Sequence, residues 1–267
     1  MYSGRESYAR APLSYVTIEI SLSYEPRINE TTVRDVFAEA VRDTFPLLQQ
    51  EEALAVRLEE ADDDIPSQLL PAMRAFTSDT STSALLKASA LTVETVAYSD
   101  HESFRVSFES ALNGLQLCSP QSLIRRVGVR YVNEIRPPAQ DGNWGKWVSP
   151  NLLGSPALLP GAKVAGSMGH VLYHLEEDYW TGFRWGEVIG TTIVDRNVPL
   201  QRKGAPPPEN GHFFVLDIDS FWDPDEAVPL DARNVAEVIE RLHVPAGQLF
   251  QASITEDAKQ YFRGEEK

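Results

Sequence analysis

The chain has 267 residues, of which 42% are hydrophobic and 24% charged, and its formal net charge is −15. This is the composition of a folded globular protein, so disorder is excluded as the default state. The acidic excess is even: residues 1–136 hold 13 basic and 20 acidic residues, and residues 137–267 hold 11 and 19. Neither half therefore has the positive charge typical of a nucleic-acid-binding module, although a local basic groove stays open.

The sequence gives no indication of a membrane or an oxidising compartment. No apolar run approaches the roughly 20 residues that span a bilayer, and the opening MYSGRESYARAPLS has no apolar signal-peptide core. The single cysteine, Cys118, excludes an intrachain disulfide. We therefore expect a cytoplasmic protein without membrane contact, in which Cys118 is a small buried side chain rather than a nucleophile.

The first elements in chain order are a strand and a helix. Residues 12–24 alternate apolar and polar side chains, which predicts a half-buried strand. A helix capped by Asn29 is expected next, ending or bending near Pro46. The acidic run at 51–64 is interpreted as a solvated loop, with docking of a basic partner as the alternative.

A second strand and helix follow. Residues 85–99 predict one strand, and Asp100 is placed to cap the helix after it. The pair Asn113–Gly114 is expected to fray the end of that helix.

The stretch RRVGVRYVNEI, residues 125–135, predicts a strand in which polar side chains interrupt an apolar run. Alternation puts Tyr131 and Asn133 on one face and Gly128 and Arg130 on the other. A covered arginine must be paired, and a covered asparagine needs hydrogen-bond partners. One interpretation is an internal salt bridge with a hydrogen-bonded asparagine. The other is that Arg130, Tyr131 and Asn133 contact a ligand or partner.

Residues 137–167 contain five prolines and five glycines, so they are expected to form a linker or a long loop. Trp144 and Trp147 lie in this segment. Two interpretations are open: the indoles anchor a binding partner, or they tuck under the loop and pin it.

Two strands are predicted next, at 168–180 and 182–195, with a hairpin turn at Thr181–Gly182. His170 and His174 would lie about 13 Å apart on one face of the first strand. That separation is too large for one metal ion, so both are interpreted as surface histidines.

The last elements are a strand at 212–221, a helix from Asp231 to Pro245 and Gly247, and a short helix with the capping box Ser253 and Glu256. Within the strand, Asp217 and Asp219 lie two residues apart on one face. Paired carboxylates at a strand end are a candidate site for a divalent metal such as Mg²⁺. The alternative is that they are ordinary solvent-exposed carboxylates at the end of a strand.

Several segments resemble a known family. The motif VGVRYVNEI, with APLSYVTIEI, FFVLDID and LFQASITEDAKQYF, resembles a sporadically distributed family of uncharacterised bacterial proteins with the central motif VGxRYxNxI. The resemblance covers nearly the whole chain and is most specific in the central motif, while Ser14 and Tyr15 depart from the family pattern. It implies no activity for any residue. The patchy distribution implies mobile defence or toxin–antitoxin-like loci.

The sequence has no Walker loop, GxSxG, HExxH, CxxC or GxGxxG. We expect an α+β fold with antiparallel sheet and packed helices. Its halves, 1–136 and 168–267, would be ferredoxin-like or related, or parts of a single domain. The leading hypothesis is a non-catalytic protein without cofactor that binds a protein partner. The alternatives are a metal-dependent enzyme on nucleotides or nucleic acid that uses Asp217 and Asp219, and an RNA-binding module that uses Arg130 and Tyr131.

Overall fold

The computed structural model describes residues 8–55, 68–138, 143–153, 166–194, 199–202, 207–209 and 211–265. The strands are β1 (Leu13–Leu22), β2 (Leu47–Ala55), β3 (Gln68–Phe76), β4 (Thr82–Lys87), β5 (Ala90–Thr95), β6 (Leu123–Ile135), β7 (Ser167–Glu176), β8 (Tyr179–Gly190), β9 (Gly211–Trp222) and β10 (Val228–Pro229). The α-helices are α1 (Thr31–Val41), α2 (His101–Cys118), α3 (Ala232–Ser253) and α4 (Glu256–Arg263), and short 3₁₀ turns are η1 (Pro26–Asn29), η2 (Trp144–Lys146) and η3 (Pro150–Leu152).

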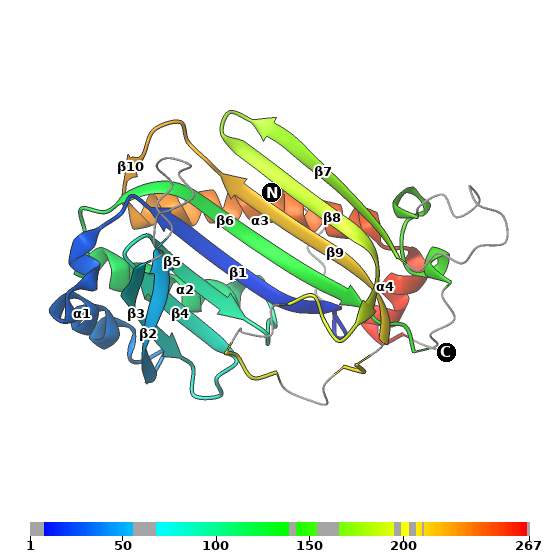
Figure 1. The fold of residues 1–267 in the computed structure, drawn as a ribbon. Helices are drawn as coiled ribbons and strands as arrows, with labels where there is room; N and C mark the ends of the chain where they lie inside the picture. Colours follow the sequence, from blue (N-terminus) through cyan, green and yellow to red (C-terminus); the bar gives the residue numbers. More distant parts are fainter. Residues whose placement is uncertain are drawn as a thin grey trace.

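These strands form one antiparallel sheet in the order β2-β3-β4-β5-β1-β6-β9-β8-β7, with β10 paired to β6 (Figure 1). The predicted α+β class and antiparallel sheet are confirmed. The strand β6 lies between the N-terminal and the C-terminal strands of the sheet, because Arg130 lies opposite Thr17 of β1 on one side and Asp219 of β9 on the other. The strands of 1–136 and of 168–267 therefore belong to one continuous sheet.

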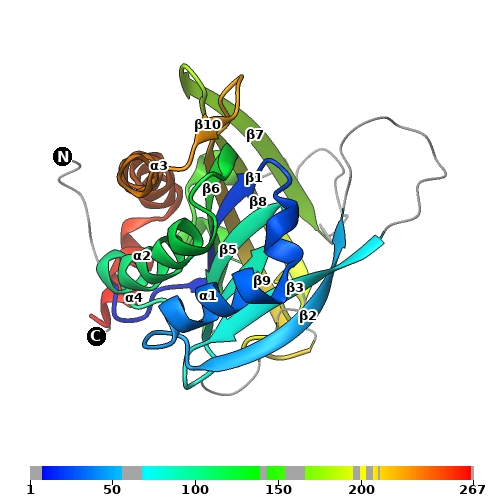
Figure 2. The same ribbon diagram turned by 90° about the vertical axis from the view of Figure 1, so that its left-hand side faces the viewer.

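The sheet is curved, and α2, α3 and α4 lie together on one side of it (Figure 2). Period-2 alternation explains this layering, because Val16, Ile18 and Ile20 of β1 are buried on the helix side. They join one core with apolar helix side chains such as Phe108 and Leu242. Each large apolar side chain buried in this way contributes about 1.5–3 kcal/mol.

The chain between 47 and 99 is a four-stranded meander rather than a loop followed by one strand. A turn at Ala88–Ser89 divides the predicted strand 85–99 into β4 and β5, which pair with Leu86 opposite Leu91. Both strands are buried on both faces, so they lack the alternation that would have separated them. Of the acidic run, Glu51 lies in β2, and residues 56–64 lie outside the described part of the chain.

Other predicted boundaries also differ. The hairpin between β7 and β8 turns at Glu177, which has φ of 44°, and not at Thr181–Gly182, which lies inside β8. The helix α3 runs through Pro245 to Ser253, because its apolar side keeps packing on the core beyond the proline.

The cap residues of two helices also differ from the prediction: Glu30 precedes α1 in place of Asn29, and Thr255 caps α4 in place of Ser253. Asp100 and Asp231 cap α2 and α3 as predicted.

Gly114 does not fray α2, which continues to Cys118. It is instead the point where α1 approaches closely. A Cβ at this position would lie 2.9 Å from Phe37 Cδ2 and 2.9 Å from Val41 Cγ1. The glycine is therefore needed for helix packing rather than for a helix end.

Replacing Gly114 with leucine is expected to lower the free energy of unfolding by about 1–3 kcal/mol through overpacking, despite the better helix propensity of leucine. Urea denaturation measures the change. The control is Asn113→Leu, because Asn113 is exposed on the same turn. A Gly114→Leu protein as stable as this control would show that α1 and α2 are not in close contact.

Candidate functional site

The strand β6 sends its polar side chains to opposite faces of the sheet. Arg130 lies on the face without helices, whereas Tyr131 and Asn133 lie beneath α3. Arg130 and Tyr131 therefore do not form one stacking surface for RNA bases.

Arg130 is engaged by a buried carboxylate. Its Nε and Nη2 donate to Asp217 Oδ1 and Oδ2 at 2.7 and 2.9 Å, and Arg184 Nη2 donates to the same Oδ2 at 2.6 Å. Asp217 is only 3% exposed. The bonds to Asp217 raise the pKa of Arg130. This arrangement matches the internal salt bridge of the first interpretation.

The second carboxylate of the proposed metal pair is also engaged. Arg126 Nη2 donates to Asp219 Oδ2 at 3.1 Å. Burial raises the pKa of Asp219, although the nearby arginines oppose this shift. Among the residues that the structure describes, no group of three or more His, Cys, Asp or Glu side chains gathers to hold a metal ion.

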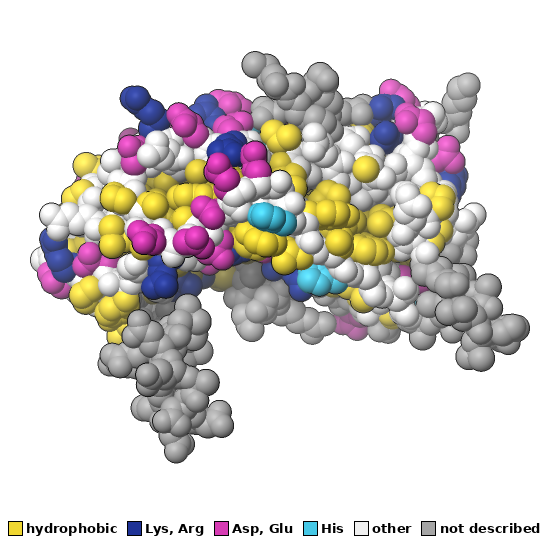
Figure 3. Space-filling model, turned by 90° about the horizontal axis from the view of Figure 1, so that it is seen from above, with side chains coloured by type: hydrophobic (Ala, Val, Ile, Leu, Met, Phe, Trp, Pro, Cys, Tyr) yellow, Lys and Arg dark blue, Asp and Glu magenta, His cyan; other side chains and the backbone are white. Residues whose placement is uncertain are grey.

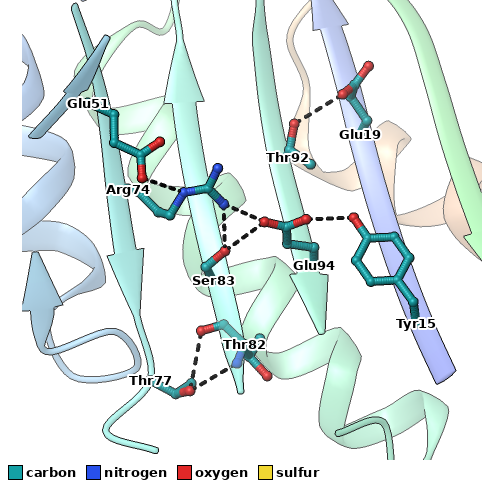
Figure 4. A network of polar contacts seen from close by, with 9 residues as sticks. All are labelled: Tyr15, Glu19, Glu51, Arg74, Thr77, Thr82, Ser83, Thr92 and Glu94. Atoms are coloured by element: carbon teal, nitrogen blue, oxygen red, sulfur yellow. Dashed lines mark hydrogen bonds and ion pairs between the residues drawn. The ribbon is translucent and has the colours of Figure 1, made fainter. Parts of the chain in front are cut away.

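The same sheet face carries a second polar network across β1, β5, β4, β3 and β2 (Figure 4). Tyr15 Oη donates to Glu94 Oε2 at 2.5 Å, and Glu94 is paired with Arg74. Arg74 also donates to Ser83 Oγ at 3.0 Å and to Glu51 Oε1 at 2.8 Å. Burial is the main reason that the pKa of Tyr15 is raised. These groups satisfy one another, so the network ties the strands together.

Trp144 and Trp147 are 8% and 7% exposed. Trp144 packs on Phe214 of β9 with ring centroids 5.5 Å apart. Trp147 packs edge-on against Tyr261 of α4 at 5.1 Å, close to Phe262. Both indoles thus tuck under their segment and pin it, and neither presents a surface to a partner.

Cys118 is a buried thiol at the end of α2, and burial raises its pKa to about 11. A thiol with such a pKa is protonated at neutral pH and is a poor nucleophile. This agrees with the packing role expected for it.

Tyr131 meets side chains that the sequence did not point to. Tyr131 Oη shares a hydrogen bond of 2.8 Å with His243 Nδ1, and His243 stacks on His101 at 4.2 Å. His101 Nε2 lies 2.5 Å from Glu240 Oε1. These partners come from α2 and α3, so only the packing of helices on the sheet reveals the cluster.

Four large apolar side chains are exposed on β7, the last strand in the sheet order. We call this strand, with the side that pairs with no other described strand, the β7 edge. Met168, Leu172, Tyr173 and Leu175 expose between 41% and 61% of their surface. Between Ser167 and Leu175 the strand contains no Asp, Glu, Lys, Arg or Pro. Figure 3 shows a band of hydrophobic side chains with histidines on it.

The β7 edge ends in acidic residues. Glu176, Glu177 and Asp178 follow one another, and the backbone N–H of Asp223 donates to Asp178 O at 3.0 Å, which brings a fourth carboxylate nearby. Arg241 pairs with Glu176 at 2.6 Å. Acidic side chains accordingly gather beside the hydrophobic band in Figure 3.

In the part of the chain that the structure describes, the fold and these surfaces define an α+β protein with one antiparallel sheet, helices on one face and an apolar edge strand. No helix in the described part of the chain is long and apolar enough to cross a membrane. No family model, curated protein or solved structure matches the chain. The family resemblance of the central motif therefore stays a prediction.

Proposed function

We propose that this protein binds a protein partner without catalysis, and that an extended segment of the partner pairs with the β7 edge. One observation carries the proposal: four large apolar side chains are exposed on an edge strand that contains no charged residue or proline between Ser167 and Leu175. Sheet edges in soluble proteins are normally blunted by charged residues, prolines or bulges, because bare edges pair with other chains. An exposed edge of this kind is a typical site of strand addition.

The strand geometry supports this mode of binding. A partner strand would receive main-chain hydrogen bonds from the unpaired side of β7, and its alternate side chains would meet Met168 and Leu172 on one face and Tyr173 and Leu175 on the other. Apolar side chains on both faces suit a partner that is covered on both sides after binding.

Charge favours a basic partner over a second copy of the chain. The hairpin end of the β7 edge carries Glu176, Glu177 and Asp178, and the whole chain has a net charge of −15. Two copies would repel each other, whereas a segment flanked by Lys or Arg would be attracted. The expected partner segment is thus an apolar strand with basic flanks.

The double variant Met168→Glu, Leu172→Glu is expected to lose the ability to bind the partner, because it places two charges where the partner strand packs. Both residues are at least half exposed, so folding should be retained. The matched control is Val106→Glu, Leu117→Glu, which makes the same change at exposed positions of α2. The measurement is capture from the native host at low salt, followed by mass spectrometry.

The proposal expects a stoichiometric basic protein with the wild type and the control variant, and none with the β7 variant. A partner that binds the β7 variant equally well would refute the assignment of this edge. Capture of no stoichiometric protein by the wild type would refute the binding function itself.

A further inference from the structure

A cavity of about 350 Å³ lies between α3, the start of α2 and the helix side of β6. Its size falls within the usual range for small-molecule sites. On α3 the cavity is lined by the small residues Ala246 and Gly247 and by the larger His243 and Phe250, and on β6 it is lined by Tyr131 and Asn133.

The wall of the cavity is largely aromatic. Tyr98, Tyr131 and Phe250 line it, and Tyr8 closes one side with its hydroxyl bonded to Gln251 at 3.0 Å. Aromatic faces stack on planar rings and attract cations through their π electrons. A flat ring is therefore the body that this wall accommodates best.

Asn133 provides a hydrogen-bond acceptor in the depth of the cavity. The residue is only 4% exposed, and its Nδ2 donates to Leu216 O at 3.2 Å. No group among the described residues donates a hydrogen bond to its Oδ1. Asn133 lines the cavity, so its amide is accessible to a ligand there. An N–H group of a ligand would supply the missing donor.

The mouth of the cavity is acidic. Asp100 and Glu102 line it, the histidines His101 and His243 line the cavity as well, and no Lys or Arg is among the described residues that do so. Hydrogen bonds from Ser103 lower the pKa of Asp100, so this carboxylate is ionised at neutral pH. Glu102 is partly neutralised by Arg105, which leaves Asp100 as the main negative group.

This arrangement excludes an anionic ligand at the start of α2. The free N–H groups of a helix N-terminus commonly attract phosphate or carboxylate. Here the carboxylate of Asp100 already accepts the backbone N–H of Ser103 at 2.8 Å. A second anion at this place would meet the charge of Asp100 rather than free N–H groups.

We infer that the cavity binds a small aromatic amine, a planar ring with an N–H donor and a positively charged amino group. The ring lies between the aromatic side chains, its N–H donates to Asn133 Oδ1, and the amino group faces Asp100. This site is separate from the β7 edge, and its test does not depend on the protein partner.

Tryptamine is the probe, and calorimetry with the full chain is the measurement. Two matched compounds test the two polar contacts: indole-3-acetate keeps the ring but reverses the charge, and 1-methyltryptamine keeps the charge but lacks the ring N–H. Tryptamine is expected to bind with a submillimolar Kd. Each of the other two should bind about tenfold more weakly or worse, since 1-methyltryptamine lacks the N–H that donates to Asn133 and indole-3-acetate brings a negative charge next to Asp100.

Two variants locate the site. Asn133→Leu is expected to weaken the binding of tryptamine about tenfold and to abolish the preference for tryptamine over 1-methyltryptamine. Ala246→Leu fills the cavity and should abolish binding, whereas Gln248→Leu adds the same side chain on the exposed side of α3 and should not. Thermal unfolding of each variant shows that it is folded.

The inference is overturned if tryptamine does not bind at millimolar concentration, or if indole-3-acetate binds as tightly as tryptamine. It is also overturned if folded Ala246→Leu binds tryptamine like the wild type.

Discussion

Replacement of Trp147 by alanine is expected to lower the free energy of unfolding by about 3–5 kcal/mol, the usual cost of removing a buried aromatic side chain. The indole is 7% exposed and packs against Tyr261 and Phe262 of α4. The backbone at Trp147 also accepts the N–H of Thr255 at 3.2 Å, so the ring holds the segment around η2 against the start of α4.

Urea denaturation of Trp147→Ala, with Leu117→Ala as the exposed control, measures this effect. Partner binding through the β7 edge should be unchanged under conditions where the variant is folded. A cost below about 1 kcal/mol, the range of exposed positions, together with loss of the partner would instead make Trp147 a contact residue.

The second large effect is expected at Asp217. Asp217→Asn should lower the free energy of unfolding by about 3 kcal/mol, because removing one partner of a buried ion pair leaves the other charge uncompensated. Asp217 accepts hydrogen bonds from both Arg130 and Arg184. The expected cost is at the lower end for such pairs, because both arginines are partly exposed.

Asp219→Asn is the matched control and should behave differently. Burial raises the pKa of Asp219 above its ordinary value of 3.8, so the folded protein favours the protonated form. The stability from this group is present below the ordinary pKa and is lost as pH rises through the raised pKa. The Asp219→Asn variant should therefore gain stability relative to the wild type as pH rises from 3.8 to 7. Equal losses for both variants at pH 7 would contradict the distinct roles of the two carboxylates.

Local patterns predicted several strands and helix caps. The alternation in β1 and β6 and the cap at Asp100 could be read from the residues alone, because each depends on near neighbours. The strands β4 and β5 could not be separated, since both of their faces are buried. The end of α3 was wrong because packing beyond Pro245 outweighs the local effect of a proline.

The candidate sites depend on contacts between distant residues, which limits what the sequence could predict. Alternation predicted that Arg130 and Asn133 lie on opposite faces of the sheet. It did not predict that Asp217 binds Arg130 or that Asn133 lines a cavity. The residues of β7 could be predicted as a strand. Their role as a sheet edge depends on the strand order, which no local pattern contains.

The most direct test of the proposed function is hydrogen exchange of the protein in complex with its captured partner and alone. Strand addition predicts that the amides of residues 167–175 exchange more slowly in the complex, because those on the unpaired side of β7 gain hydrogen bonds to the partner. Unchanged exchange in these residues, with protection gained elsewhere, would contradict the account and place the binding surface on another part of the molecule.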